Sequence, residues 1–435
     1  MPTPIRCSRS RLHSKHGWGA PLLLALLAAA ALFLSLPRLT TPPRYVFDEL
    51  YYVYTAQHYV DGEEAYSTAD LPRDDPALEW THPPLAKLII AGGILLGGDS
   101  PVGWRIASVL FGVAGVWLAC ALGLALSGQL AVGAAAGGLL LLDTLYLVES
   151  RTGMSNLFLT VFALAALLGA YFALTLPPAQ ARLPLLLTGI ALGLALATKW
   201  SAVTLWGLLT LALLWRWWQL RASVAADERA ALRAWAITAL LCFGSLPPLI
   251  YALSWLHFFL TGHSVDDLAA LHAAMLQYHR HLGVVHSDSS VWWQWPLTLQ
   301  PVKYFVARRP GELMVVLGSG NPALYAPLAL AVAWVAVRWW RDRRAEAVIL
   351  LIGFFGQWLP WALSPRGAFV YHFLPAVPVG CVALAVLVTA GWRRGGLWRG
   401  AAMAYVLAVA ALFLWLYPIS TAVPLPTDQV AQRLL

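Results

Sequence analysis

Long apolar runs recur along the chain, and polar connections separate them. Many exceed the roughly 18 apolar residues that mark a membrane span. They are continuous rather than alternating, and a span in hydrocarbon must be a helix or a closed barrel because no water can satisfy its backbone. The pattern therefore predicts eleven membrane-spanning helices, at residues 18–36, 103–126, 131–149, 154–176, 184–198, 200–215, 235–259, 321–338, 346–363, 368–390 and 400–417.

Two of these predictions have alternatives. The fifth and sixth segments are short, and only Thr198-Lys199-Trp200 separates them, so they could form one broken segment. The first segment follows basic residues, as a cleaved signal peptide does. Its apolar run is about nineteen residues and no clear Ala-x-Ala site follows, which favours a retained span.

The pattern leaves two long connections, at residues 37–102 and 260–320. Long loops beside a compact scaffold often carry function. In the first loop, residues 85–96 are apolar but too few to span, which predicts an interfacial or re-entrant helix. In the second, apolar residues recur at helical spacing between 265 and 282, which predicts an amphipathic helix on the membrane surface.

The composition and charge place this pattern in a membrane. Hydrophobic residues make up 60% of the chain and charged residues 11%, whereas a soluble domain carries roughly 25% charged residues. With residues 1–17 in the cytoplasm, the Lys and Arg clusters gather on one side with few acids, as the positive-inside rule requires. Both long loops then lie outside. The formal net charge of +8 reflects this topology, and no basic domain is left to bind nucleic acid.

Two adjacent carboxylates, Asp48 and Glu49, lie beyond the first span among aromatic residues. A carboxylate can serve in acid–base catalysis, and cations can neutralise a departing phosphate. The pair therefore suits glycosyl transfer from a lipid phosphate, if single basic residues at the outer ends of other spans converge on that phosphate. A solvated loop end and snorkelling anchors are the structural alternatives. The basic residues are Lys87, Arg105, Arg151, Lys199 and Arg366.

Other polar residues weigh less. Asp143 lies in the third predicted span, where a carboxylate is functional or paired by default, with Arg105 or Arg151 as candidate partners. A transporter would place charges near the membrane midplane, whereas here they lie at span ends and in loops. Four histidines have spacings that match no common metal site, so no metal site is predicted. They are His272, His279, His281 and His286.

Nine short motifs occur in a fixed order between residues 44 and 390. Together they make the chain resemble the protein O-mannosyltransferases that use polyprenyl-phosphate-mannose, which are GT-C glycosyltransferases of family 39. The motifs are Phe47-Asp48-Glu49; His82-Pro83-Pro84-Leu85 with Lys87; Gly103-Trp104-Arg105; Ser150-Arg151-Thr152; Thr198-Lys199-Trp200; Tyr278-His279; His286 with Trp293-Gln294-Trp295-Pro296; Gly320-Asn321-Pro322; and Arg366 with Phe369, Tyr371 and Pro375.

The resemblance implies an all-α integral membrane protein with the GT-C fold, about eleven transmembrane helices and two long extracytoplasmic loops. Residues 18–390 would form the catalytic membrane domain, and residues 391–435 the last transmembrane helix and an extracytoplasmic tail. The absence of an inserted β-trefoil points to a bacterial-type plasma-membrane enzyme with its active site outside.

The implied reaction transfers mannose from polyprenyl-phosphate-mannose to Ser or Thr hydroxyls of proteins, with inversion at the sugar carbon. The lipid-linked donor, the protein acceptor and membrane lipids are the expected partners, and the secretion machinery is a candidate partner. No cofactor is required, and a divalent ion beside the lipid phosphate is left open. The alternative is a related GT-C enzyme that transfers another sugar from a polyprenyl phosphate to a lipid or glycan acceptor. His82 before the Pro-Pro pair favours the protein-modifying enzymes.

The resemblance also assigns roles to residues. Asp48 would be the catalytic base, and Glu49 would orient the acceptor or the sugar. The family usually places Asp where this chain has Asn156, which puts one contact of the site in doubt. Arg105 leads the residues expected to bind the lipid phosphate, and the others are His82, Lys87, Arg151, Lys199 and Arg366. The residues expected to contact the acceptor or the sugar are Tyr51, His286, Trp293 and Trp295.

Overall fold

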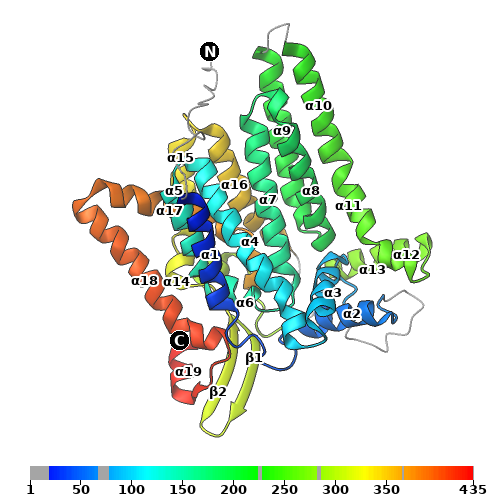
Figure 1. The fold of residues 1–435 in the computed structure, drawn as a ribbon, viewed down its shortest axis with the longest axis vertical. Helices are drawn as coiled ribbons and strands as arrows, with labels where there is room; N and C mark the ends of the chain where they lie inside the picture. Colours follow the sequence, from blue (N-terminus) through cyan, green and yellow to red (C-terminus); the bar gives the residue numbers. More distant parts are fainter. Residues whose placement is uncertain (1–18, 67–77, 224–227, 282–285, 365–366, 435) are drawn as a thin grey trace.

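Long helices lie side by side through most of the molecule, and shorter helices and a β-hairpin gather at one end of them (Figure 1). The computed structural model describes residues 19–66, 78–223, 228–281, 286–364 and 367–434. The helices of the bundle are α1 (Gly19–Ser35), α4 (Pro101–Ser127), α5 (Leu130–Leu141), α6 (Thr144–Glu149), α7 (Ser155–Thr175), α8 (Arg182–Thr198), α9 (Ala202–Ser223), α10 (Arg229–Gly244), α11 (Leu246–Ser254), α14 (Pro322–Tyr325), α15 (Leu328–Trp339), α16 (Arg344–Trp358), α17 (Val377–Arg394) and α18 (Gly396–Ser420).

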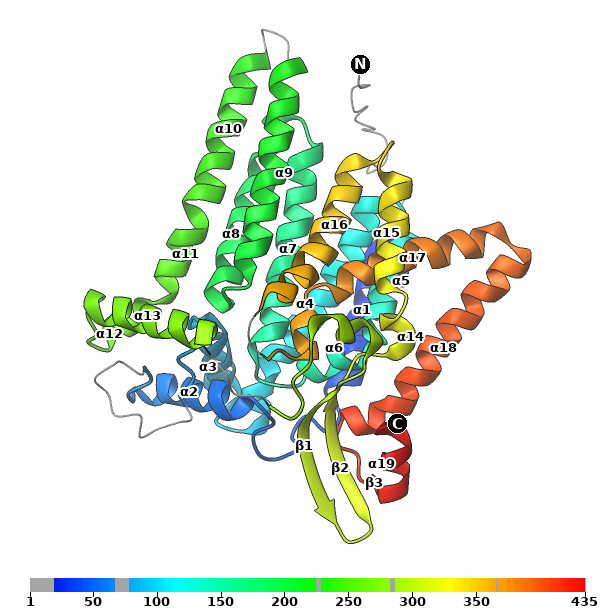
Figure 2. The ribbon, with the colours of Figure 1, turned by 180° about the vertical axis from the view of Figure 1, so that it is seen from behind.

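The elements gathered at the end of the bundle come from the two predicted loops, the end of the predicted span 235–259 and the carboxyl terminus (Figure 2). Short 3-10 turns connect several of the longer helices. The gathered elements are α2 (Glu49–Asp61), α3 (Leu85–Gly97), α12 (Leu256–Leu260), α13 (Val265–His281), β1 (Val302–Arg309), β2 (Glu312–Gly318), β3 (Leu425–Pro426) and α19 (Thr427–Leu434). The 3-10 turns are η1 (Pro178–Gln180), η3 (Trp292–Leu297), η4 (Leu359–Leu363) and η5 (Val370–Phe373).

The predicted helical membrane fold is confirmed. Within the described ranges, seven helices are long and apolar enough to cross a membrane, and four shorter apolar helices accompany them. Each predicted span contains a helix, while the number of eleven crossings stays a prediction. The third span differs from its prediction because it breaks between Leu141 and Thr144. There the Asp143 carboxylate accepts from the N–H groups of Leu145 and Tyr146, and so caps a new short helix, α6.

Close contact between small residues joins the helices of the bundle. A Cβ atom added at Gly133 of α5 would lie 2.6 Å from the carbonyl oxygen of Cys120 on α4. One added at Gly189 of α8 would lie 2.2 Å from the carbonyl of Cys242 on α10. Lipid tails are as apolar as the side chains between helices, so membrane helices depend on close packing of this kind.

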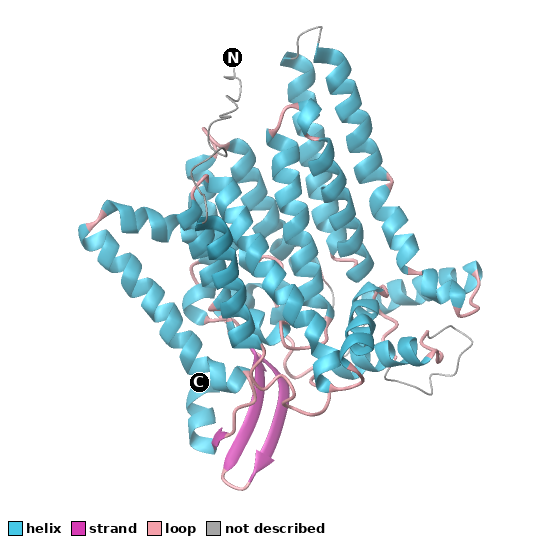
Figure 3. Cartoon of the chain, viewed as in Figure 1, coloured by secondary structure: helices cyan, strands magenta, loops and turns pink. Residues whose placement is uncertain are grey.

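A small β-sheet interrupts the otherwise helical chain (Figure 3). In the described residues its three antiparallel strands have the order β1-β2-β3. The turn between β1 and β2 uses Pro310 and Gly311, and Gly311 has a φ of 75°, which glycine adopts without strain. The helical prediction for the membrane segments did not include this hairpin, which projects away from the bundle.

Candidate active site

Asp48 immediately precedes α2, at the end of the bundle where both long loops lie. Its neighbour Phe47 has a φ of 50°, a left-handed conformation that costs a non-glycine residue roughly 1–3 kcal/mol. The Phe47 N–H donates to the carbonyl of Tyr304 on β1 at 3.0 Å, and the two rings stack with centroids 4.8 Å apart. The hairpin therefore fixes the backbone that carries Asp48.

The surroundings of Asp48 favour its neutral form more than water does. Burial raises the pKa of its carboxyl to about 7, while the positive charge of Lys199 opposes this rise and the negative charge of Glu79 adds to it. A carboxyl with a pKa near the working pH is well matched to taking a proton from a substrate hydroxyl.

Glu49 faces a different set of partners. Its two carboxylate oxygens accept from Nε and Nη2 of Arg105 at 2.9 and 2.8 Å. They also accept from the backbone N–H groups of Gly153 at 2.8 Å and Val46 at 2.9 Å. The Glu49 side chain is fully buried. This carboxylate is thus enclosed by protein donors.

Arg105 is enclosed in the same way. Beyond Glu49, its guanidinium donates to the carbonyls of Leu39, Pro42 and Arg44 at 2.8–3.0 Å. A guanidinium has five N–H donors, and these contacts use all of them. The expected roles of Arg105 at the leaving phosphate and of Glu49 toward the substrate stay predictions. The pair fastens the segment before α2 to α4.

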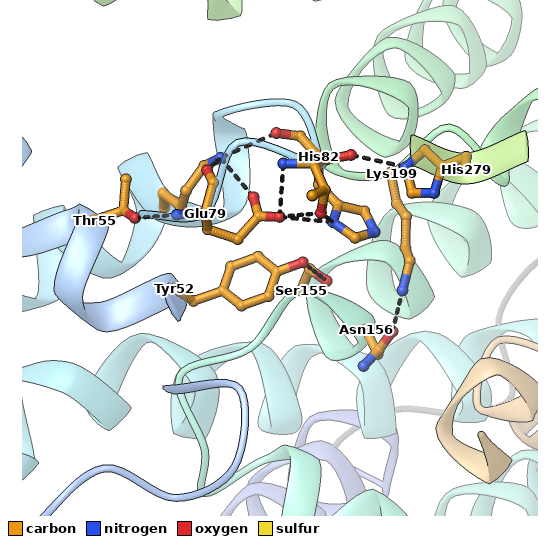
Figure 4. Close-up of polar contacts among 10 residues, drawn as sticks. Tyr52, Thr55, Glu79, His82, Ser155, Asn156, Lys199 and His279 are labelled. Carbon is orange, nitrogen blue, oxygen red and sulfur yellow. Dashed lines mark hydrogen bonds and ion pairs between the residues drawn. The ribbon is translucent and has the colours of Figure 1, made fainter. Parts of the chain in front are cut away.

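A second buried ion pair joins the first loop to α3 (Figure 4). The Glu79 carboxylate accepts from Lys87 Nζ at 2.7 Å and contacts Nδ1 of His82 at 2.9 Å. Its backbone N–H donates to Thr55 of α2 at 2.7 Å. Glu79 was not among the expected site residues, although its position shortly before His82 and Lys87 is a signal that the sequence contains.

Burial and the contacts with Glu79 determine the protonation state of His82. Burial lowers the pKa of His82 to about 3, although Glu79 raises it. Burial alone would raise the pKa of Glu79, but Lys87 and His82 hold it well below its usual value. His82 is therefore neutral at pH 7. Because Nδ1 faces the Glu79 carboxylate, which can only accept, the single ring proton lies on Nδ1. Nε2 is buried and has no hydrogen-bond partner among the described residues, so the ring can accept a hydrogen bond from a ligand there.

Lys199 lies opposite this group, between α8 and α9. Its Nζ donates to Oδ1 of Asn156 at 2.9 Å and lies 5.8 Å from the centre of the Tyr371 ring. The Asn156 amide reaches Glu149 at 3.5 Å, and Glu149 accepts from the Tyr304 hydroxyl at 2.5 Å. A neutral amide is thus one direct partner of the buried ammonium, and this amide in turn contacts a carboxylate that is bound to β1. Sequence reasoning also missed Glu149.

The remaining expected residues divide into four groups. Arg151 donates to the carbonyls of Ser35 and Pro37 and so holds the chain after α1. Trp295 is buried and donates to the Ser290 hydroxyl, which gives it a packing role. Arg366 lies outside the described residues. The side chains that remain exposed are Tyr51, His286 and Trp293, and the His286 ring meets those of Phe47 and Phe369.

A pocket of about 220 Å³ is lined by Ser201, two residues after Lys199 in the chain. Its walls come from the start of α9, the end of α16, η4 and η5, and they mix hydroxyl, amide and imidazole groups with aromatic surface. Nε2 of Gln357 in its wall is buried and has no hydrogen-bond partner in the described part of the chain. The polar lining residues are Ser201, Thr204, Gln357, Ser364 and His372.

Two family models match the chain. One, described as dolichyl-phosphate-mannose-protein mannosyltransferase, matches residues 22–261. The other, described as the C-terminal four-transmembrane region of protein O-mannosyltransferase, matches residues 264–435. A polyprenol-phosphate-mannose–protein mannosyltransferase of Corynebacterium glutamicum is 28% identical over 100% of this chain and 95% of its own. That of Mycobacterium tuberculosis is 26% identical over 94% and 89%.

Solved structures resemble the fold. The Saccharomyces cerevisiae protein O-mannosyltransferase Pmt1-Pmt2 complex, bound to the sugar donor, matches with a TM-score of 0.83 at 14% identity. The match covers 99% of this chain and 94% of that one. ArnT from Cupriavidus metallidurans, bound to undecaprenyl phosphate, matches with a TM-score of 0.61 at 15% identity over 96% and 79%. At these identities the matches concern the fold, and they confirm the expected GT-C architecture.

Proposed function

The chain belongs to the dolichyl-phosphate-mannose-protein mannosyltransferase family and is a multi-pass membrane glycosyltransferase, and we propose how its residues divide the reaction. In this proposal the chain transfers mannose from polyprenyl-phosphate-mannose to Ser or Thr hydroxyls of proteins, with inversion at the sugar carbon. The observation that carries the assignment is Asp48, a half-buried carboxyl group whose surroundings raise its pKa to about 7 and whose strongest opposing charge is Lys199.

Asp48 is the general base. It takes the proton of the acceptor hydroxyl while the hydroxyl oxygen bonds to the anomeric carbon of mannose. The bond from that carbon to the phosphate oxygen breaks, and polyprenyl phosphate leaves with the bonding electrons. Attack opposite the leaving group inverts the sugar carbon, so the base and the phosphate site stand on opposite sides of the sugar.

Lys199 is the proposed ligand of the phosphate, to which it supplies charge. Neutral His82 carries its proton on Nδ1 toward Glu79, so its unpartnered Nε2 accepts a hydrogen bond from a sugar hydroxyl in this proposal. The pocket beyond Ser201 would take the lipid phosphate or the first part of the lipid, and Gln357 offers a donor there. Lys87 and Arg151 support the site through the contacts described above, and Arg366 stays a prediction.

The proposed site faces the outside of the cell. In Figure 1, α1 runs toward the end of the bundle where α2, α3 and the hairpin lie, so its first residue points to the opposite end. If the basic residues before α1 are cytoplasmic, α2 and its neighbours are extracytoplasmic. The same proposal places the enzyme in the plasma membrane, gives it proteins as acceptors and includes the secretion machinery as a candidate partner.

Purified protein tests the proposed function directly. We expect it to transfer mannose from polyprenyl-phosphate-mannose to a Ser/Thr-rich peptide, as measured by mass spectrometry of the peptide, and to give a product of inverted configuration. Modification of a co-reconstituted lipid or glycan, with peptide left unmodified, would instead support the related GT-C enzyme. Parallel reactions with other polyprenyl-phosphate sugars determine the donor.

The rate should fall in acid. A base with a pKa near 7 is increasingly protonated below pH 7, so we expect kcat/KM to decrease about tenfold per pH unit there and to level off above it. The donor is a phosphodiester that keeps one charge over this range. Peptide mannosylation between pH 5.5 and 9, with the melting temperature measured in each buffer, checks this expectation. A flat profile between pH 5.5 and 8 in folded protein would exclude Asp48 as the titrating base.

Asn156 should set the strength of phosphate binding. Asn156→Asp places a carboxylate beside Lys199, so we expect the KM for polyprenyl-phosphate-mannose to increase on the order of tenfold, as one added charge at short range can cause. The matched control is the double variant Glu149→Gln with Asn156→Asp, which moves a negative charge without adding one. It should recover most of the donor KM. An unchanged donor KM in Asn156→Asp would show that Lys199 does not bind the phosphate.

A further inference from the structure

The β-hairpin has an open edge. The sheet order is β1-β2-β3, so in the described part of the chain no strand pairs with the outer side of β1. An edge strand presents backbone N–H and C=O groups that can pair with another polypeptide. β1 is therefore a candidate surface for binding an extended chain.

The pairing pattern shows which groups face this edge. The Val315 carbonyl on β2 accepts from the Ala422 N–H, so it points away from β1. Val306 is opposite Val315 in the ladder. Val306 and Val315 therefore form a non-hydrogen-bonded pair, in which both residues direct their backbone N–H and C=O away from each other. The N–H and C=O of Val306 thus face the open edge. The same groups of Arg308, two residues later in β1, face this edge as well. Val306 is 47% exposed and Arg308 is exposed as well.

The same edge already binds a segment of the active site. The Tyr304 carbonyl, two residues before Val306, accepts from the N–H of Phe47, and Asp48 follows Phe47 in the chain. Two strand residues span about 7 Å. A chain paired at Val306 would thus end beside the residue that precedes the proposed base, within reach of it by one or two residues.

We propose that the open edge of β1 binds the acceptor polypeptide as an extended strand and leads its hydroxyl to Asp48. This inference rests on the proposed function. Strand addition recognises a peptide through its main chain, so it suits an enzyme whose acceptors share a Ser or Thr but differ around it. Phe47 occupies the edge at Tyr304, so the added strand stops there and its next residues turn toward Asp48.

Backbone-methylated peptides test this proposal without altering the enzyme. Each peptide carries a single Thr and one N-methyl group, which removes one N–H donor, and the group is moved one residue at a time along the peptide. We expect the peptide KM to increase about 3- to 10-fold, the value of one hydrogen bond, at every second position on one side of the Thr. The intervening positions should show little change, because their N–H groups face away from β1.

Two variants test the enzyme's side of this pairing, the backbone of β1. Val306→Pro removes the N–H that faces the open edge and spares the bonds between β1 and β2, and an edge strand tolerates proline. Val306→Ala keeps the N–H and is the matched control. We expect a several-fold higher peptide KM in Val306→Pro than in Val306→Ala, with the donor KM unchanged in both.

The outcomes are distinct. With wild-type transfer to peptide present, an N-methyl scan without two-residue periodicity overturns the docking edge and leaves the proposed function intact. Absence of wild-type transfer overturns both. If Arg308→Gln with Arg309→Gln alters only the dependence of activity on anionic lipid in nanodiscs, and the scan is flat, the hairpin binds lipid headgroups and the proposal is wrong.

Discussion

Asp48→Asn is expected to reduce kcat for mannosyl transfer by about 10²- to 10⁴-fold, the usual contribution of a positioned base. The amide keeps the shape of the carboxyl but cannot take the hydroxyl proton. The stability of the fold should not decrease. Folding raises the pKa of Asp48. At any pH above the ordinary pKa of an Asp side chain, the ionised carboxylate therefore destabilises the folded protein. The variant should therefore melt at the same or a higher temperature at pH 8.

The matched control is Asp61→Asn, an exposed acid at the other end of α2, which should keep wild-type kcat. Donor and peptide KM values should change little in Asp48→Asn, since the residue acts in the chemical step. Full activity in Asp48→Asn would refute the base assignment. A large fall in melting temperature would show that the carboxylate holds the fold instead.

Glu49→Gln is expected to have the opposite profile, with a large loss of stability and a smaller loss of kcat in the molecules that stay folded. It removes one half of a fully buried ion pair and leaves Arg105 uncompensated, which typically costs about 3–5 kcal/mol. The melting temperature and the yield of detergent-solubilised protein measure the first effect, and kcat per folded molecule the second.

Arg105→Lys gives a second test of the same pair. Lysine keeps the charge but cannot make the bidentate contact or reach three carbonyls at once, so we expect a lower melting temperature in this variant too. If Glu49→Gln melts like wild type and loses kcat, then Glu49 contacts substrate as the family resemblance implied. Asp48 and Glu49 would then both act on the substrate, rather than one in catalysis and the other in stability.

The sequence was sufficient to predict the membrane helices, because long apolar runs have few alternative structures in lipid. It also predicted α13 and α3 from spacing and length alone. The break at Asp143 was missed because a capping carboxylate inside an apolar run resembles a functional charge. The hairpin was missed because a short alternating segment between membrane helices has little weight beside them, although Pro310-Gly311 marked its turn.

The site was predictable in part, since the motifs identified Asp48, His82 and Lys199 but not how they face one another. Asp48 and Glu49 are neighbours in sequence, yet at the start of a helix successive side chains point in different directions. Which of the two met Arg105 depended on packing against α4. Glu79 and Glu149 were hidden for a similar reason, because only the folded chain brings each to its partner.

If Asp48 is the base, the Glu49–Arg105 contact also links catalysis to bilayer thickness. α4 has 27 residues, which at about 1.5 Å each makes about 40 Å, more than the roughly 30 Å hydrocarbon core of a bilayer. A helix this long tilts or thickens the surrounding lipid. Arg105 lies near its first turn and fastens the chain before α2 to it, so the depth of Asp48 relative to the lipid phosphates follows the tilt of α4. Lipid chain length thereby becomes a variable of the reaction.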